Sequence, residues 1–96
     1  MNSSKGNSEF YDKLKKTLDS EHTYPSVYLY KFIVPNTGDQ VDQVKSIFNL
    51  PGAVISTKNS KTNKYCSVSI EIIELSSEAI IQKYREVSSI KGIISL

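Results

Sequence analysis

The residues best suited to binding chemistry lie on two segments that are expected to be neighbouring strands. They are a lysine, a tyrosine, two serines and a glutamate: Lys31, Tyr65, Ser67, Ser69 and Glu71. An ammonium group beside several hydroxyls is suited to hold a small anion or metabolite. Two alternatives stay open: a contact with another protein, or a solvated surface on which Lys31 and Glu71 form an ion pair.

A second polar cluster surrounds the turn before residue 65. It contains Ser60, Lys61, Asn63 and Lys64. Backbone amides and two lysines can hold a phosphate or an acidic partner, but an ordinary exposed turn explains the same residues. The turn lacks the glycines of a phosphate-binding loop, so it does not predict a nucleotide site. Ser60 and Lys64 complete the candidate binding surface.

No catalytic or metal-binding constellation is expected. Cys66 alternates with Val68 and Ile70, which predicts a buried thiol, and His22 lies far away in a connector. One cysteine and one histidine cannot by themselves form a disulfide or a Cys/His zinc site. We therefore expect a protein that is not an enzyme and needs no cofactor or metal.

The size and charge of the chain narrow the function further. Ninety-six residues form one small domain, and twelve basic against ten acidic side chains give a net charge of +2. That charge is too small to predict a nucleic-acid or membrane surface, and the aromatic signature of an RNA-recognition motif is missing. We find no apolar run long enough for a signal peptide or a membrane span, so we expect a cytoplasmic protein.

The chain is organised around residues 64–75. Apolar Val68, Ile70 and Ile72 alternate there with polar residues, which is the period of a strand with one dry face. A second strand is predicted over 26–34, where Lys31 marks the more open face.

The remaining elements follow from helical periodicity and turn residues. Helices are predicted from residue 8 and over 39–49 and 77–89, and shorter strands over 53–58 and 91–96. Residues 1–7 are polar and are expected to be disordered. The predicted organisation is thus a disordered segment (1–7), a helix with its connector (8–23) and a folded domain (24–96).

The element order after the first helix is β-α-β-β-α-β, the order of the ferredoxin-like plait. Right-handed crossovers place the first and third strands side by side and parallel at the centre. The predicted fold is α+β: a four-stranded antiparallel sheet of order 4-1-3-2 with two helices on one face and an extra N-terminal helix. Lys31, Tyr65, Ser67, Ser69 and Glu71 then share the opposite face.

Four short patches of the sequence are similar to a known family. They are Tyr24-Pro25 with Tyr30-Lys31-Phe32-Ile33; Val41-Asp42-Gln43-Val44; Ser60 followed by Lys64-Tyr65-Cys66-Ser67-Val68-Ser69-Ile70; and Ile81 with Tyr84-Arg85-Glu86. In their order and spacing they resemble the YbeD-like family of small bacterial proteins, whose founding member carries the name of a lipoate regulatory protein. The resemblance implies a ferredoxin-like plait similar to ACT-type regulatory domains. It implies no activity.

Two functions are compatible with these observations. The first is a non-enzymatic regulatory or adaptor domain that works by contact with a protein partner or a second copy, because Leu29 and Ile33 accompany Lys31 on the open face. The second is an ACT-type sensor that binds a metabolite at a sheet or dimer interface. No nucleic-acid or membrane partner is expected.

Overall fold

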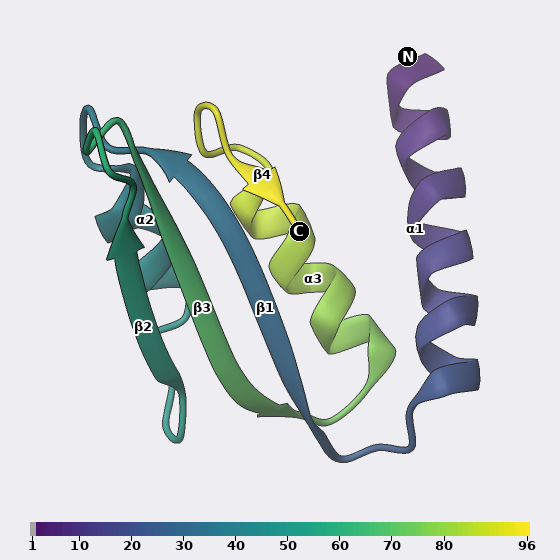
Figure 1. Cartoon of the computed structure of the whole chain (residues 1–96). Coiled ribbons are helices and arrows are strands. Elements are labelled where there is room, and N and C mark those ends of the chain that lie inside the picture. Colours follow the sequence, from purple (N-terminus) through teal and green to yellow (C-terminus); the bar gives the residue numbers. More distant parts are fainter. Residues whose placement is uncertain (1) are drawn as a thin grey trace.

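A computed structural model describes residues 2–96 of the chain, with side chains from residue 9 onward. The elements are α1 (Asn2–Glu21), β1 (Ser26–Pro35), α2 (Gln40–Ile47), β2 (Val54–Asn59), β3 (Tyr65–Glu74), α3 (Ser77–Val87) and β4 (Ile94–Ser95), shown in Figure 1. The sheet has the order β2-β3-β1-β4, and every neighbouring pair is antiparallel. The predicted α+β, ferredoxin-like fold is confirmed.

The relative direction of the two central strands differs from the prediction. β1 and β3 run antiparallel, so the expected parallel pair is wrong. A right-handed crossover makes β1 and β2 parallel, and the short hairpin from β2 to β3 then reverses the chain. β3 must therefore run against β1.

Alternation along the two central strands creates the core. Tyr30 pairs with Ile70 and Phe32 with Val68, and all four side chains are buried on the face that the helices cover. Cys66 shares this face and is buried, as its position in the alternation predicted. The helices contribute further buried side chains: Val44, Ile80, Ile81 and Val87, with Phe48 directly after α2.

Local signals explain where the hairpin turns and where α3 begins. The hydroxyl of Ser76 accepts a hydrogen bond from the backbone N–H of Ala79 (3.1 Å), so Ser76 caps α3. Asn63 adopts a φ of 59° in the hairpin, a left-handed conformation that asparagine tolerates better than most residues.

The first helix is longer than predicted and packs on the domain. It begins at Asn2, so residues 2–7 are helical here and only Met1 of the segment expected to be disordered lies outside the described residues. Extending an established helix costs little per residue. Leu18 is buried against the core, and the Arg85 guanidinium lies 4.2 Å from the ring centre of Tyr11. Along the described chain, no helix is both long and apolar enough to cross a membrane.

Candidate functional site

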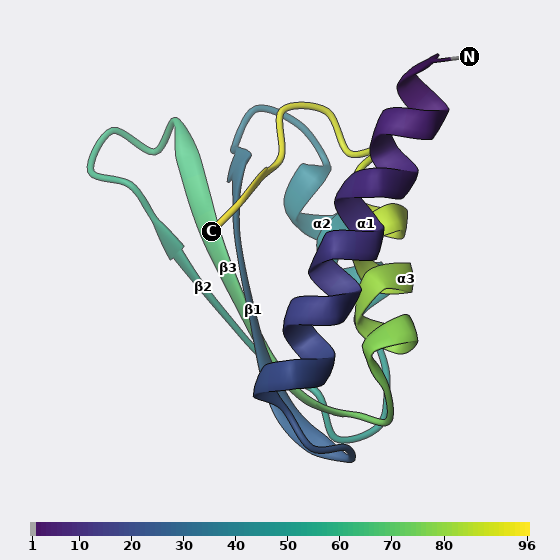
Figure 2. The same ribbon diagram turned by 90° about the vertical axis from the view of Figure 1, so that its right-hand side faces the viewer.

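One face of the sheet carries no helix. Figure 2 shows α1, α2 and α3 on the same side of the strands. Side chains on the other side, which we name the open face, follow from the strand register and the odd positions of β1 and β3. They are Val27, Leu29, Lys31 and Ile33 of β1; Val54, Ser56 and Lys58 of β2; Tyr65, Ser67, Ser69, Glu71 and Ile73 of β3; and Ile94 of β4.

The structure places the five strand residues of the predicted surface on this open face. Lys31 lies directly opposite Ser69, while Glu71 lies opposite Leu29. Lys31 and Glu71 are therefore diagonal neighbours, and the expected ion pair does not occur among the ion pairs of the described residues. The sequence alone could not predict this offset, because a shift of two residues between the strands keeps every side chain on the same face.

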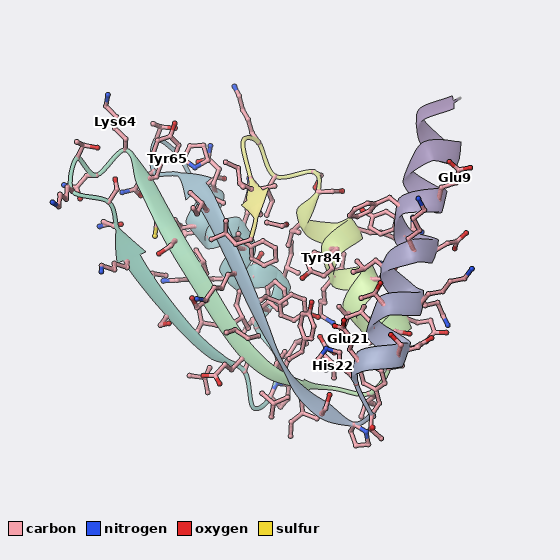
Figure 3. The ribbon with its side chains drawn as sticks, turned by 45° about the vertical axis from the view of Figure 1, so that its right-hand side comes forward. Glu9, Glu21, His22, Lys64, Tyr65 and Tyr84 are labelled. Atoms are coloured by element: carbon pink, nitrogen blue, oxygen red, sulfur yellow. The ribbon has the colours of Figure 1, made fainter. Side chains whose placement is uncertain are left out.

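The hairpin end of the sheet holds the other two predicted residues. The Ser60 hydroxyl accepts a hydrogen bond from the Tyr65 N–H (3.2 Å), and the Ser60 N–H donates to the Tyr65 carbonyl (2.9 Å). Ser60 thus closes the hairpin. Figure 3 shows Lys64 and Tyr65 at this turn, where the Lys64 carbonyl accepts from the Asn36 N–H (2.9 Å). Three of the predicted residues, Ser60, Tyr65 and Ser67, thus line one small cavity, while Lys31, Ser69 and Glu71 lie farther along the sheet.

A cluster of exposed apolar side chains at the other end of the open face was only partly predicted. Val27 lies opposite Ile73, and Glu71 lies between Leu29 and Val54. These four apolar side chains are each 49–63% exposed. Val54 and Ile73 were missed, although Ile73 continues the same alternation as Ser69 and Glu71 and could have been found from it.

The cavities on the open face are small. One of about 190 Å³ lies between Ile33, Lys58 and Tyr65 at the hairpin end, and one of about 270 Å³ lies between Val27, Val54 and Ile73. Pockets that enclose a drug-sized ligand usually measure roughly 300–1,000 Å³. The open face is therefore better shaped for a broad contact than for enclosing a small molecule.

A buried polar cluster, absent from the predicted site, lies on the helix side of the sheet. The Tyr30 hydroxyl donates a hydrogen bond to the Glu74 carboxylate, and both side chains are buried. The hydroxyls of Tyr28 and Tyr84 share a hydrogen bond of 3.0 Å. Glu74 has the same strand parity as Ile70 and Ile72, so the alternation itself carried the signal for its burial.

The electrostatics of this cluster favour neutral tyrosines. Burial, and then the hydrogen bond to Glu74, raise the pKa of Tyr30 well above its ordinary value. Burial, and then the hydrogen bond with Tyr28, raise the pKa of Tyr84. Both phenols therefore stay protonated at neutral pH, and neither is primed as a base or nucleophile. Within the described part of the chain, no three His, Cys, Asp or Glu side chains gather into a metal-binding group.

Comparisons with known proteins place the chain in a family. The solution structure of protein HP0495 from H. pylori is similar, with a TM-score of 0.58 and 17% sequence identity over 82% of this chain and 92% of that one. At this identity the likeness shows a shared fold. Comparison with curated proteins gave no match. The family model described as "Protein of unknown function (DUF493)" matches residues 19–96, and the chain therefore belongs to the DUF493 family.

Proposed function

We propose that this protein is a small, non-enzymatic regulatory or adaptor domain of the bacterial cytoplasm that acts by protein contact through its open face. The observation that carries the proposal is the exposed cluster of Val27, Leu29, Val54 and Ile73. Contiguous apolar patches on one face of a domain commonly mark sites of protein contact.

A second copy of the chain is the partner that we propose for this face. Lys31 and Glu71 lie on the same face as the apolar cluster, and neither forms an ion pair within the described chain. In a two-fold face-to-face dimer, Lys31 of one copy can meet Glu71 of the other, and this happens twice by symmetry. Such a surface is complementary to itself in both charge and polarity.

A metabolite sensor of the ACT type is the alternative. It is favoured by the small cavity at the hairpin end, which Lys58, Tyr65 and Ser67 line with one ammonium group and two hydroxyls. A dimer interface could deepen that cavity. Thermal-shift measurements with amino acids, lipoate and nucleotides test this alternative, and a concentration-dependent rise in melting temperature would support it.

Sedimentation velocity over a range of protein concentrations tests the proposed contact. We expect a reversible dimer, and we expect the double variant Val27→Ser/Ile73→Ser to weaken it at least about tenfold, since each change removes apolar burial. Phe10→Ser is the matched control, because Phe10 is equally exposed but lies on α1. A monomer at all concentrations, or equal weakening by the control, would contradict the homodimer.

A further inference from the structure

One edge of the sheet is only partly paired. β4 pairs with Phe32 and Ile33 of β1, and the Leu96 N–H donates to the Lys31 carbonyl (2.9 Å). Backbone groups alternate between the two sides of a strand, so the N–H and C=O groups of Val27 and Leu29 point to the same side as those of Lys31. Across residues 2–96, nothing pairs with them there. The segment 27–29 is therefore an open edge of a central strand.

The helix layer extends past this open edge. Figure 1 shows α1 beyond β1, beside α3, while β4 covers only the upper part of β1. A cavity of about 370 Å³ adjoins β4, which covers the neighbouring part of β1, and it is lined by Phe10 and Leu14 of α1, Tyr84 and Val87 of α3 and Ser95 of β4. Figure 3 shows Tyr84 between β1 and α1. Among the residues whose side chains are described, the lining is mostly apolar and contains no charged side chain.

The edge and the cavity fit one kind of occupant. Ser95 lies opposite Phe32 and lines the cavity. A strand that continued β4 along β1 would therefore direct every second side chain toward the cavity. Free backbone N–H and C=O groups at this position recognise an extended chain and supply its affinity, while the cavity selects its side chains. We infer that residues 27–29 of β1 and the adjoining groove bind an extended peptide strand of another protein, antiparallel to β1 and apolar at every second residue.

A second copy of this chain fits the site poorly. If two copies joined through their β1 edges, the β1 strand of the second copy would be the added strand. Its own α3 and core would then lie on the side of the sheet where α1 of the first copy already lies (Figure 2). An isolated peptide strand carries no helix layer and meets no such obstacle. Lys31 lies on the outer side of this edge, which favours an acidic residue among the outward positions of the peptide. The site uses the backbone edge of β1 and the cavity on the helix side of the sheet, and it goes beyond the proposed function.

The inference is tested by selecting peptides that bind the full chain from a random library. The peptides are about ten residues long, which is the upper length of an ordinary strand. We expect selected peptides to alternate apolar and polar residues. In the ¹⁵N-labelled protein, the amide signals of Val27, Leu29 and Lys31 should then shift on binding. N-methylation of the peptide amides that face β1 should weaken binding at least about tenfold, because each methyl removes a ladder hydrogen bond.

Two protein variants complete the test. Leu29→Pro removes an N–H that points to the open edge and leaves the β1–β3 hydrogen bonds in place, so it should weaken peptide binding about tenfold or more. Leu29→Thr changes the same side chain but keeps the N–H, and it should bind within about threefold of the native chain. No selected binder, shifts confined to other surfaces, or insensitivity to N-methylation would overturn the inference. The inference would also be overturned if the amide signals of Val27 and Leu29 changed only with protein concentration and not with peptide, since that result means self-association.

Discussion

The hydroxyl of Tyr30 on β1 donates a hydrogen bond to the carboxylate of Glu74 on β3, inside the core and across 44 residues of sequence. Tyr30 is fully buried and Glu74 is 4% exposed. A buried carboxylate without a donor is costly, whereas a paired one is tolerated. This pair links β1 to the C-terminal end of β3. The apolar cluster lies at the same end of β3, on the opposite face of the sheet.

Removing the donor should destabilise the fold. We expect Tyr30→Phe to lower the free energy of unfolding by about 1–3 kcal/mol, because Glu74 stays buried without its partner. Replacing both residues, as Tyr30→Phe/Glu74→Met, should recover part of that loss, since no unpaired charge remains. Urea unfolding measures both. Tyr65→Phe is the control, because its exposed hydroxyl has no partner among the described hydrogen bonds, and a Tyr30→Phe loss no larger than that of the control would refute the account of this pair.

Stability should fall at alkaline pH. The pKa of Tyr30 is raised in the folded state, so above the ordinary tyrosine pKa of about 10 the unfolded chain loses a proton that the folded chain keeps. The folded state then binds more protons, and the free energy of unfolding decreases as pH rises, by at most about 1.4 kcal/mol per pH unit for this group. Unfolding measured between about pH 9 and 11.5 should show this decline, with a shallower slope in Tyr30→Phe. An identical slope in that variant would contradict the assignment.

The attachment of α1 can be tested at one buried residue. Leu18 is buried against the core, so Leu18→Ala should cost about 2–5 kcal/mol. Phe10→Ala on the same helix should cost under about 0.5 kcal/mol, because Phe10 is mostly exposed. Thermal or urea unfolding of the two variants distinguishes a packed helix from a loosely attached one. Equal and small losses would mean that α1 does not contribute to the core.

Alternation in the sequence was enough to predict the sheet faces. The pattern around Val68 and Ile70 predicted which side of β3 is buried, and the same reasoning placed Lys31 and Ser69 on the open face. Side-chain period is local information, because successive residues of a strand must point to opposite sides. The element order then selected the topology.

Contacts between distant residues could not be read in the same way. The solvated-surface alternative included a Lys31–Glu71 ion pair, but the register sets Lys31 opposite Ser69. Glu74 looked like a surface residue by type, and the register sets it opposite Ser26. Only the side-chain geometry shows that the Tyr30 hydroxyl reaches it. The groove beside α1 is lined by residues of α1, α3 and β4 that lie far apart in the sequence, so only the tertiary structure brings them together.

The central claim is that the open face is buried in a contact between two copies. Methyl relaxation by a soluble paramagnetic probe, measured at low and high protein concentration, tests it most directly. The account predicts that the methyl groups of Val27, Leu29 and Ile73 become protected as concentration rises, while that of Leu14 beside α3 does not change. Equal exposure of the open-face methyl groups at every concentration, or protection confined to α1 and α3, would contradict it.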